Sequence, residues 1–117
     1  MNWKTIKQLA SYQKDGKKAG LLEELVENYF QEFPDLILAL KENILNKNSA
    51  MLERVAHKLK GGSYTIGAQS LGDIFNKLEI KGRSGDFNEI PSLLEEINKI
   101  SQQTEMELRD FIEQQQK

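Results

Sequence analysis

VAHKLKGGSYTIGAQSLGDIFNKLE, residues 55–79, is the stretch that decides the fold of this 117-residue chain. Its apolar residues recur every three or four positions on either side of a break at residues 65–67, a spacing typical of two amphipathic helices joined by a turn. The stretch also holds the only histidine, His57, and two glycines, Gly61 and Gly62, soon after it. Each glycine inside a helix costs about 0.8 to 1.0 kcal/mol relative to alanine, so this pair needs a reason.

Apolar residues at the same spacing predict helices along the rest of the chain. The expected segments are a short helix over residues 3–9, longer ones over 22–33 and 36–44, and a long last helix over 90–111. Together with the hairpin, these amphipathic segments can bury their stripes by packing as a bundle. We therefore expect an all-α fold in one domain over residues 1–117, an antiparallel four-helix bundle with an additional short N-terminal helix.

Turn-forming residues indicate where the helices begin and end. Pro34 should end the helix over 22–33 or open the next one, and residues 46–48, Asn-Lys-Asn, favour a turn. Ser49 is the expected N-cap of the following helix. Residues 82–86, Gly-Arg-Ser-Gly-Asp, predict a glycine-rich loop before the last helix, which tolerates Pro91 in its first turn.

Composition excludes several classes of function. A formal net charge of −2 with scattered basic residues gives no general attraction for nucleic acid, and no apolar run approaches the roughly 18 to 20 residues that span a membrane. The N-terminus lacks the apolar region of a secretory signal, and without cysteine there is no disulfide or thiol chemistry. One histidine and no EF-hand loop offer no metal site. We expect a cytoplasmic monomer without nucleic-acid, membrane or metal binding.

His57 is predicted to face solvent. At about 100° per residue, it lies roughly 150° from the centre of the apolar stripe of its helix. A surface histidine without a role is the ordinary interpretation of a lone histidine. However, Gly61 lies one turn further on the same side, where a missing side chain would let a bulky partner reach the imidazole. Close helix packing at Gly62 and a fraying helix end at residues 61–63 are the alternatives for the glycines.

Lys60 and Glu79 are the charged residues expected near the ring. Lys60 lies within about 60° of His57 around the helix axis, close enough to approach an anion on the ring. The midpoint of positions 57 and 79 is 68, beside the predicted turn, so an antiparallel hairpin brings Glu79 to the level of His57. A carboxylate that accepts from Nδ1–H would leave Nε2 free as a nucleophile. A surface pair with Lys77 or Lys81 is the alternative for Glu79.

Taken together, residues 57–79 resemble the signature of histidine-containing phosphotransfer (HPt) domains. The matching residues are His57, Leu59, Lys60, Gly61, Gly62, Gly67, Ala68, Leu71, Leu78 and Glu79. The resemblance implies a four-helix bundle whose exposed His57 receives a phosphoryl group from a receiver-domain aspartate, or returns it, in a multistep phosphorelay. It assigns Lys60 to stabilising phosphate, Gly61 to the open approach and Glu79 to orienting the ring. Phe75 and Gly62 differ from the residues frequent in the family, and neither touches the expected chemistry.

The same resemblance implies the partners, which are response-regulator receiver domains and a sensor (hybrid) histidine kinase. The Mg²⁺ would belong to the receiver, so this chain needs no cofactor and has no autonomous kinase activity. ATP binding is not expected, because residues 62–67 have the glycine spacing of a P-loop but Ala68-Gln69 follows in place of Lys-Ser/Thr. The expected docking surface surrounds His57 and consists of Ala50, Arg54, Lys58, Gly61, Gly62 and Tyr64.

A helical module that docks receivers without carrying phosphate is the main alternative, and the presence of His57 with Lys60 and Glu79 argues against it. A hydrolase triad is disfavoured because Ser63 lies about 120° around the helix from His57. A helix-turn-helix DNA binder would need a more basic second helix than residues 69–81 provide. The sequence leaves open the cognate partners, the direction of phosphate flow, the pathway, and whether the chain is a whole protein or an excised domain.

Overall fold

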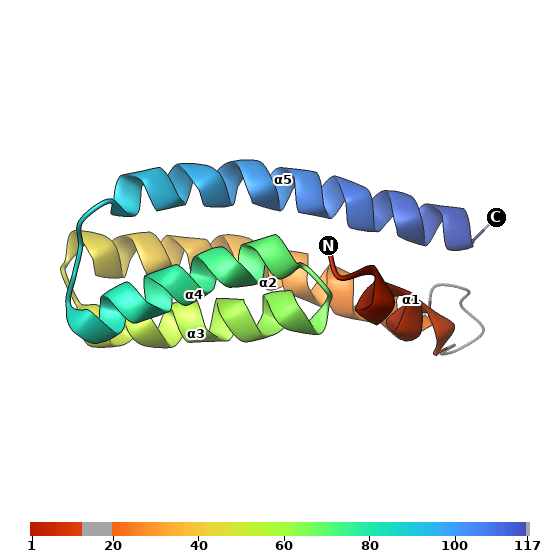
Figure 1. Ribbon diagram of the computed structural model, residues 1–117, viewed down its shortest axis with the longest axis horizontal. Helices are drawn as coiled ribbons and strands as arrows, with labels where there is room; N and C mark the ends of the chain where they lie inside the picture. The colour runs from red at the N-terminus through yellow and green to blue at the C-terminus, as the bar shows by residue number, and fades with distance from the viewer. Residues whose placement is uncertain (13–19, 117) are drawn as a thin grey trace.

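The computed structural model describes residues 1–12 and 20–116. Over these residues it contains no strand and consists of α1 (Trp3–Ser11), α2 (Gly20–Leu45), α3 (Ser49–Thr65), α4 (Gln69–Ser84) and α5 (Ile90–Gln115). The four long helices run alternately up and down beside one another, and the short α1 packs at the end of the bundle where α3 turns into α4 (Figure 1). The expected all-α bundle with an additional N-terminal helix is confirmed.

The prediction of a helix boundary at Pro34 is wrong, because α2 passes through this residue without ending. Proline inside a helix removes one hydrogen bond and costs about 3 kcal/mol. On either side of Pro34, however, α2 buries side chains completely, with Val26 and Leu40 both at 0% exposure. Burial of one such side chain stabilises the fold by about 1.5 to 3 kcal/mol. Packing of the whole stripe therefore outweighs the local cost, and Pro34 itself is exposed.

Two other predicted boundaries also differ. Asn48, and not Ser49, caps α3: its side chain accepts a hydrogen bond from the backbone N–H of Met51 at 3.2 Å. Residues 82–84, expected in a loop, are the last turn of α4, whose C-cap is Gly85 with φ at 71°. Pro91 lies in the first turn of α5, as predicted.

The hairpin of α3 and α4 forms the centre of the molecule. Its turn is at residues 66–68, one residue later than the predicted 65–67, because Thr65 is still part of α3. Gly67 has a φ of +77°, and its carbonyl accepts from Asn2 N–H at 2.8 Å. Large side chains from all five helices and from the turn are fully buried in one core around this hairpin. They are Ile6, Leu22, Leu40, Leu52, Leu59, Ile66, Leu71, Phe75, Leu78, Ile90 and Leu108.

Two glycines of α4 allow this helix to approach α3 closely. A Cβ atom at Gly72 would overlap the ring of Tyr64, and one at Gly82 would lie 2.6 Å from the backbone nitrogen of Glu53. Gly82 is therefore not a loop residue but the point where the two helices touch. The close approach brings the side chains of α3 and α4 on the solvent-facing side of the hairpin within reach of one another.

Candidate functional site

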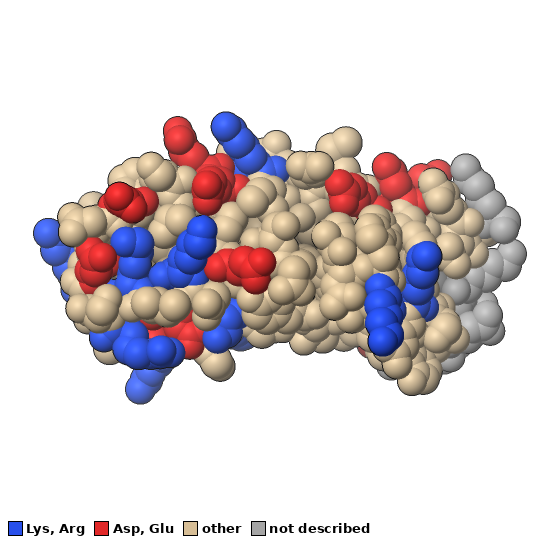
Figure 2. Space-filling view, in the orientation of Figure 1, with Lys and Arg blue, Asp and Glu red and all other residues tan. Residues whose placement is uncertain are grey.

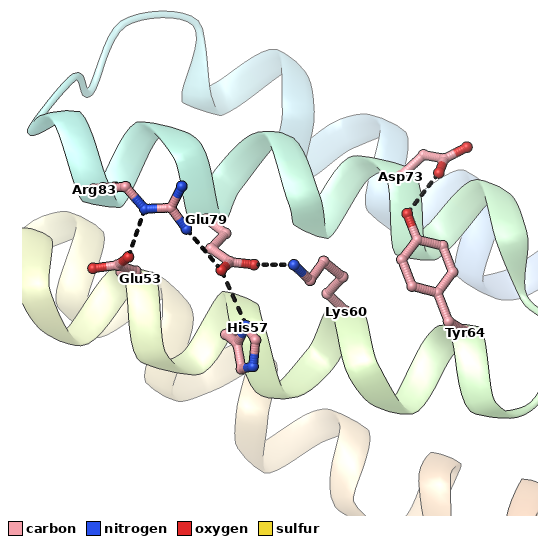
Figure 3. Close-up of polar contacts among 7 residues, drawn as sticks. All are labelled: Glu53, His57, Lys60, Tyr64, Asp73, Glu79 and Arg83. Carbon is pink, nitrogen blue, oxygen red and sulfur yellow. Dashed lines mark hydrogen bonds and ion pairs between the residues drawn. The ribbon is translucent and has the colours of Figure 1, made fainter.

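His57 lies in the middle of α3 with its side chain 68% exposed. Its neighbours along the chain, Val55, Ala56 and Leu59, are buried, so the helix turns the imidazole away from the core. The expectation that this histidine faces solvent is confirmed. Figure 3 shows the ring on the surface of α3, with one nitrogen directed at a carboxylate that comes from α4.

The carboxylate belongs to Glu79, whose side chain is only 5% exposed. Its Oε2 lies 3.0 Å from His57 Nδ1. Because an ionised carboxylate only accepts hydrogen bonds, Nδ1 carries the proton and donates it, which leaves the Nε2 lone pair free. The register predicted from the turn therefore brings these two residues together. The alternative surface pairing of Glu79 is wrong: Lys81 instead pairs with Asp86 at 3.3 Å.

Lys60 completes the charge balance of the buried carboxylate. Its Nζ lies 2.7 Å from Glu79 Oε1, and this ammonium is the partner of that buried oxygen. Lys60, and after it His57, lowers the pKa of the Glu79 carboxyl below its ordinary value of 4.5, against the opposing effect of burial. Glu79 is therefore a carboxylate at neutral pH. Lys60, expected beside the ring, is bound to the acid that holds the ring.

Arg83 is a member of the site that the sequence reasoning missed. Its Nη2 donates to Glu79 Oε2 at 3.1 Å, and its Nε donates to Glu53 Oε2 at 2.9 Å (Figure 3). Arg83 was assigned to the loop over residues 82–86, where no helical spacing applies. The signal was present, because Arg83 follows Glu79 by four positions, the spacing of a helical ion pair.

Comparison with known families matches residues 24–116 to the Hpt domain. The chain belongs to the Hpt domain family. No match was found among curated proteins or among solved structures. Domains of this family act in phosphotransfer as intermediates without kinase activity of their own, and in general they interact with receiver domains and kinases.

The surface of this Hpt domain is open beside His57. A Cβ atom at Gly61 would meet nothing within 4 Å, so this glycine is not needed for packing inside the protein. Gly62 differs: a Cβ there would lie 3.1 Å from the ring of Tyr29 on α2. Gly62, expected on the docking surface, is thus half-buried against α2, the close-packing alternative for that residue.

Among the other expected docking residues of the Hpt domain, Ala50, Arg54 and Lys58 are exposed on α3. Tyr64 points toward α4, where its hydroxyl donates to Asp73 at 2.7 Å (Figure 3). A groove of about 320 Å³ between α2 and α3 adjoins this surface. It is lined by Leu25, Asn28, Tyr29, Glu32, Leu36, Lys58, Leu59, Gly62, Thr65 and Ile66.

Lysine and arginine side chains, with acidic side chains among them, gather at one end of the Hpt domain, over the first half of α3 and the second half of α4 (Figure 2). In the described ranges 1–12 and 20–116, no three His, Cys, Asp or Glu side chains are grouped so that they could hold a metal ion. None of the five described helices combines the length and apolar character needed to cross a membrane. In the described residues the site is an exposed imidazole with acidic and basic side chains close to it.

Proposed function

We propose that this Hpt domain carries a phosphoryl group on His57, which it accepts from a receiver-domain aspartate and passes to another. The observation that carries the proposal is the exposed imidazole whose Nδ1 lies 3.0 Å from the buried Glu79 carboxylate. An accepting carboxylate fixes the tautomer and orients the ring with Nε2 toward solvent. The open surface at Gly61 gives a partner access to this nitrogen.

In the proposed reaction, the Nε2 lone pair attacks the phosphorus of an aspartyl phosphate. The N–P bond forms while the P–O bond to the aspartate breaks, and its electron pair stays on the aspartate as a carboxylate. The Nδ1 proton stays on the ring, where the hydrogen bond to Glu79 stabilises the positive charge that develops as Nε2 is phosphorylated. The reverse sequence of bond changes returns the group to an aspartate.

Lys60 is proposed to stabilise the phosphoryl group. It is three residues after His57 on α3, on the same side of the helix as the ring. The Mg²⁺ that neutralises charge during transfer would be held by the acidic pocket of the receiver, so no cofactor is proposed on this chain.

The proposed partners are response-regulator receiver domains and a sensor (hybrid) histidine kinase, which places the protein in the cytoplasm. The docking surface would centre on His57 and include the exposed face at Ala50, Arg54, Lys58 and Gly61. The exposed Arg54 and Lys58 would complement an acidic receiver pocket, and such complementarity raises the rate of encounter.

The test is phosphoryl transfer from phosphorylated receiver domains to the full chain and to its His57→Gln variant, in the presence of Mg²⁺. The wild type should acquire an acid-labile, base-stable phosphate, and the variant should acquire none. Because the His57 side chain is 68% exposed, the variant should keep the far-ultraviolet circular dichroism of the wild type.

Stoichiometric labelling of the folded His57→Gln variant would refute the assignment of the site. The competing function, a module that docks receivers without carrying phosphate, predicts that the wild type binds receivers and never becomes labelled. The two functions are therefore separated by the phosphorylation state of the wild-type chain.

A further inference from the structure

If His57 carries phosphate, two anions lie near Lys60, which are the Glu79 carboxylate and the phosphoryl group. In the structure its ammonium lies 2.7 Å from Glu79 Oε1, which is buried. Stabilising a phosphoryl group on Nε2 requires the same ammonium to approach the phosphate oxygens. Those oxygens carry more negative charge than one carboxylate, so Lys60 should turn toward them. Phosphorylation would then remove from Glu79 its closest cation.

Loss of that cation would destabilise the ionised form of the buried Glu79 carboxyl. The Glu79 side chain is 5% exposed, and an uncompensated buried charge is strongly destabilising. Such a group takes up a proton or moves toward water. Either response weakens the acceptor that holds the Nδ1–H of His57, at the moment when the phosphorylated ring needs it.

Arg83 lies where it can prevent protonation or displacement of Glu79. Its Nη2 lies 3.1 Å from Glu79 Oε2, the oxygen that also accepts from His57, whereas Lys60 uses Oε1. The guanidinium can therefore stay in contact with the carboxylate when the ammonium leaves. It also retains its charge under all relevant conditions.

The guanidinium is itself held from the other helix. Glu53 on α3 accepts from Arg83 Nε at 2.9 Å, and the contact with Glu53 raises the pKa of Arg83 more than the contact with Glu79 does. Gly82 makes this bridge geometrically possible, because there the backbone of α4 lies against the backbone of Glu53. Arg83 is thus anchored independently of Lys60.

We propose that Arg83 is a positioning residue. It keeps the Glu79 carboxylate ionised and oriented while the ammonium of Lys60 interacts with the phosphoryl group on His57. The inference rests on the proposed function. Arg83 acts through Glu79, and its contribution is larger in the phosphorylated protein than in the resting one, where Lys60 shares the task.

The first test uses phosphoramidate, a small phosphoryl donor that releases ammonia when Nε2 attacks its phosphorus, so that receiver docking plays no part. Arg83→Gln removes the charge and should slow the labelling of His57 about fivefold. Arg83→Lys keeps the charge but not the two-nitrogen bridge to Glu53 and Glu79, so it should recover only part of the rate. The matched control is Arg109→Gln on α5, which removes an Arg–Glu hydrogen bond of the same i,i+4 type, in which Arg109 Nε donates to Glu105 Oε2 at 2.9 Å. This control should label at the wild-type rate.

The second readout is the Nδ1–H proton resonance of His57, followed by NMR in the resting and phosphorylated full chain. In Arg83→Gln it should persist in the resting form and broaden by solvent exchange in the phosphorylated form. A merely structural contribution of Arg83 would broaden it in both forms, and that result would overturn the inference.

Other results also decide the question. Wild-type labelling rates in Arg83→Gln, or slowing with phosphorylated receivers but not with phosphoramidate, would make Arg83 a surface residue or a docking residue and overturn the positioning role. Failure of the wild type itself to label His57 would remove the proposed function and this inference with it. Failure of the inference alone would appear only in the Arg83 variants.

Discussion

The two ends of the α3–α4 hairpin contain the same kinds of residue, which are a close-packed glycine and an acid, but the acids differ in what they contact. Near the turn, Gly72 on α4 accommodates Tyr64, whose hydroxyl donates to Asp73 at 2.7 Å. Toward the other end, Gly82 lies against the backbone of Glu53, and Glu79 accepts hydrogen bonds across the same interface. Each end therefore has a glycine that brings the helices together and an acid of α4 that receives a donor of α3.

The acids differ in burial and in the number of partners. Asp73 is exposed, and its principal partner is the Tyr64 hydroxyl. Glu79 is buried and is surrounded by donors from both helices, which are His57, Lys60 and Arg83. A solvated acid with neutral donors stabilises the hairpin modestly, whereas a buried acid compensated by cations can orient a reactive group. Burial of the acid, more than its residue type, therefore distinguishes Glu79 at the site from Asp73 near the turn.

The largest expected contrast comes from truncating each acid. Glu79→Ala should slow phosphoramidate labelling of His57 by about tenfold to a hundredfold, the range for carboxylates that orient metal-binding histidines. Asp73→Ala should leave the rate unchanged, because Asp73 contacts Tyr64 and not the histidine. Labelling rates of both variants, with circular dichroism to confirm the helical fold, measure the difference.

Two outcomes would contradict this contrast. Equal slowing by both variants would mean that hairpin rigidity, and not orientation of the ring, controls reactivity. Loss of the helical signal in Glu79→Ala would make the role of Glu79 structural.

A second contrast concerns the two glycines. At Gly82 an added methyl group meets the backbone of α3, which cannot rotate away, so Gly82→Ala should destabilise the protein by about 1 to 2 kcal/mol despite the better helix propensity of alanine. At Gly72 the methyl group meets the ring of Tyr64, which can turn. Gly72→Ala should therefore change stability by less than about 0.5 kcal/mol, since the gain of about 1 kcal/mol in propensity offsets the lost hydrogen bond.

Urea unfolding at neutral pH, with unchanged m values as the sign of a two-state transition, tests this pair. If Gly72→Ala proves as costly as Gly82→Ala, the ring of Tyr64 is fixed by the fold. The turn end would then be as rigid as the end that holds the site.

Much of this arrangement was predictable from the sequence, because it follows from local periodicity and from the symmetry of a hairpin. A turn at residues 65–67 fixes which residues of two antiparallel helices face one another, and the contact of His57 with Glu79 follows from counting. Exposure of His57 follows from its angle to the apolar stripe. These inferences need only the geometry of one pair of helices.

What was missed depends on contacts that a local pattern does not contain. Pro34 predicts a helix boundary, yet packing of apolar side chains on both sides keeps α2 continuous. Gly82 reads as a loop residue, although its lack of a side chain serves the contact with Glu53. For the same reason the sequence pattern does not predict the contact of Arg83 with Glu79, because the i,i+4 spacing pairs two residues only where both are helical. The burial of Glu79 is likewise set by how close α3 and α4 lie.

A third prediction is that the stabilisation contributed by Glu79 is lost at acid pH, whereas the stabilisation contributed by Tyr64 is lost at alkaline pH. The pKa of Glu79 is lowered from 4.5, with Lys60 as the main cause, so the stabilisation linked to its ionisation is fully present above pH 4.5. It is lost as the pH falls through the lower pKa of the folded state. The stability difference between wild type and Glu79→Gln, measured by urea unfolding, should therefore be constant from pH 7 to 5 and disappear on further acidification. A difference that persists in acid would contradict this.

At the turn end the sign is reversed. The hydrogen bond to Asp73 raises the pKa of Tyr64 above 10.0, so its stabilisation is fully present below pH 10.0 and is lost as the pH rises through the folded-state pKa. Because this bond is exposed to solvent, the difference between wild type and Tyr64→Phe should stay below about 1 kcal/mol and vanish in alkali. Burial raises the pKa of Tyr29 to about 12, but Tyr29 is present in both proteins and its titration cancels. No difference between the two proteins at neutral pH would show that ring packing over Gly72, which phenylalanine keeps, and not the hydroxyl, stabilises that end of the hairpin.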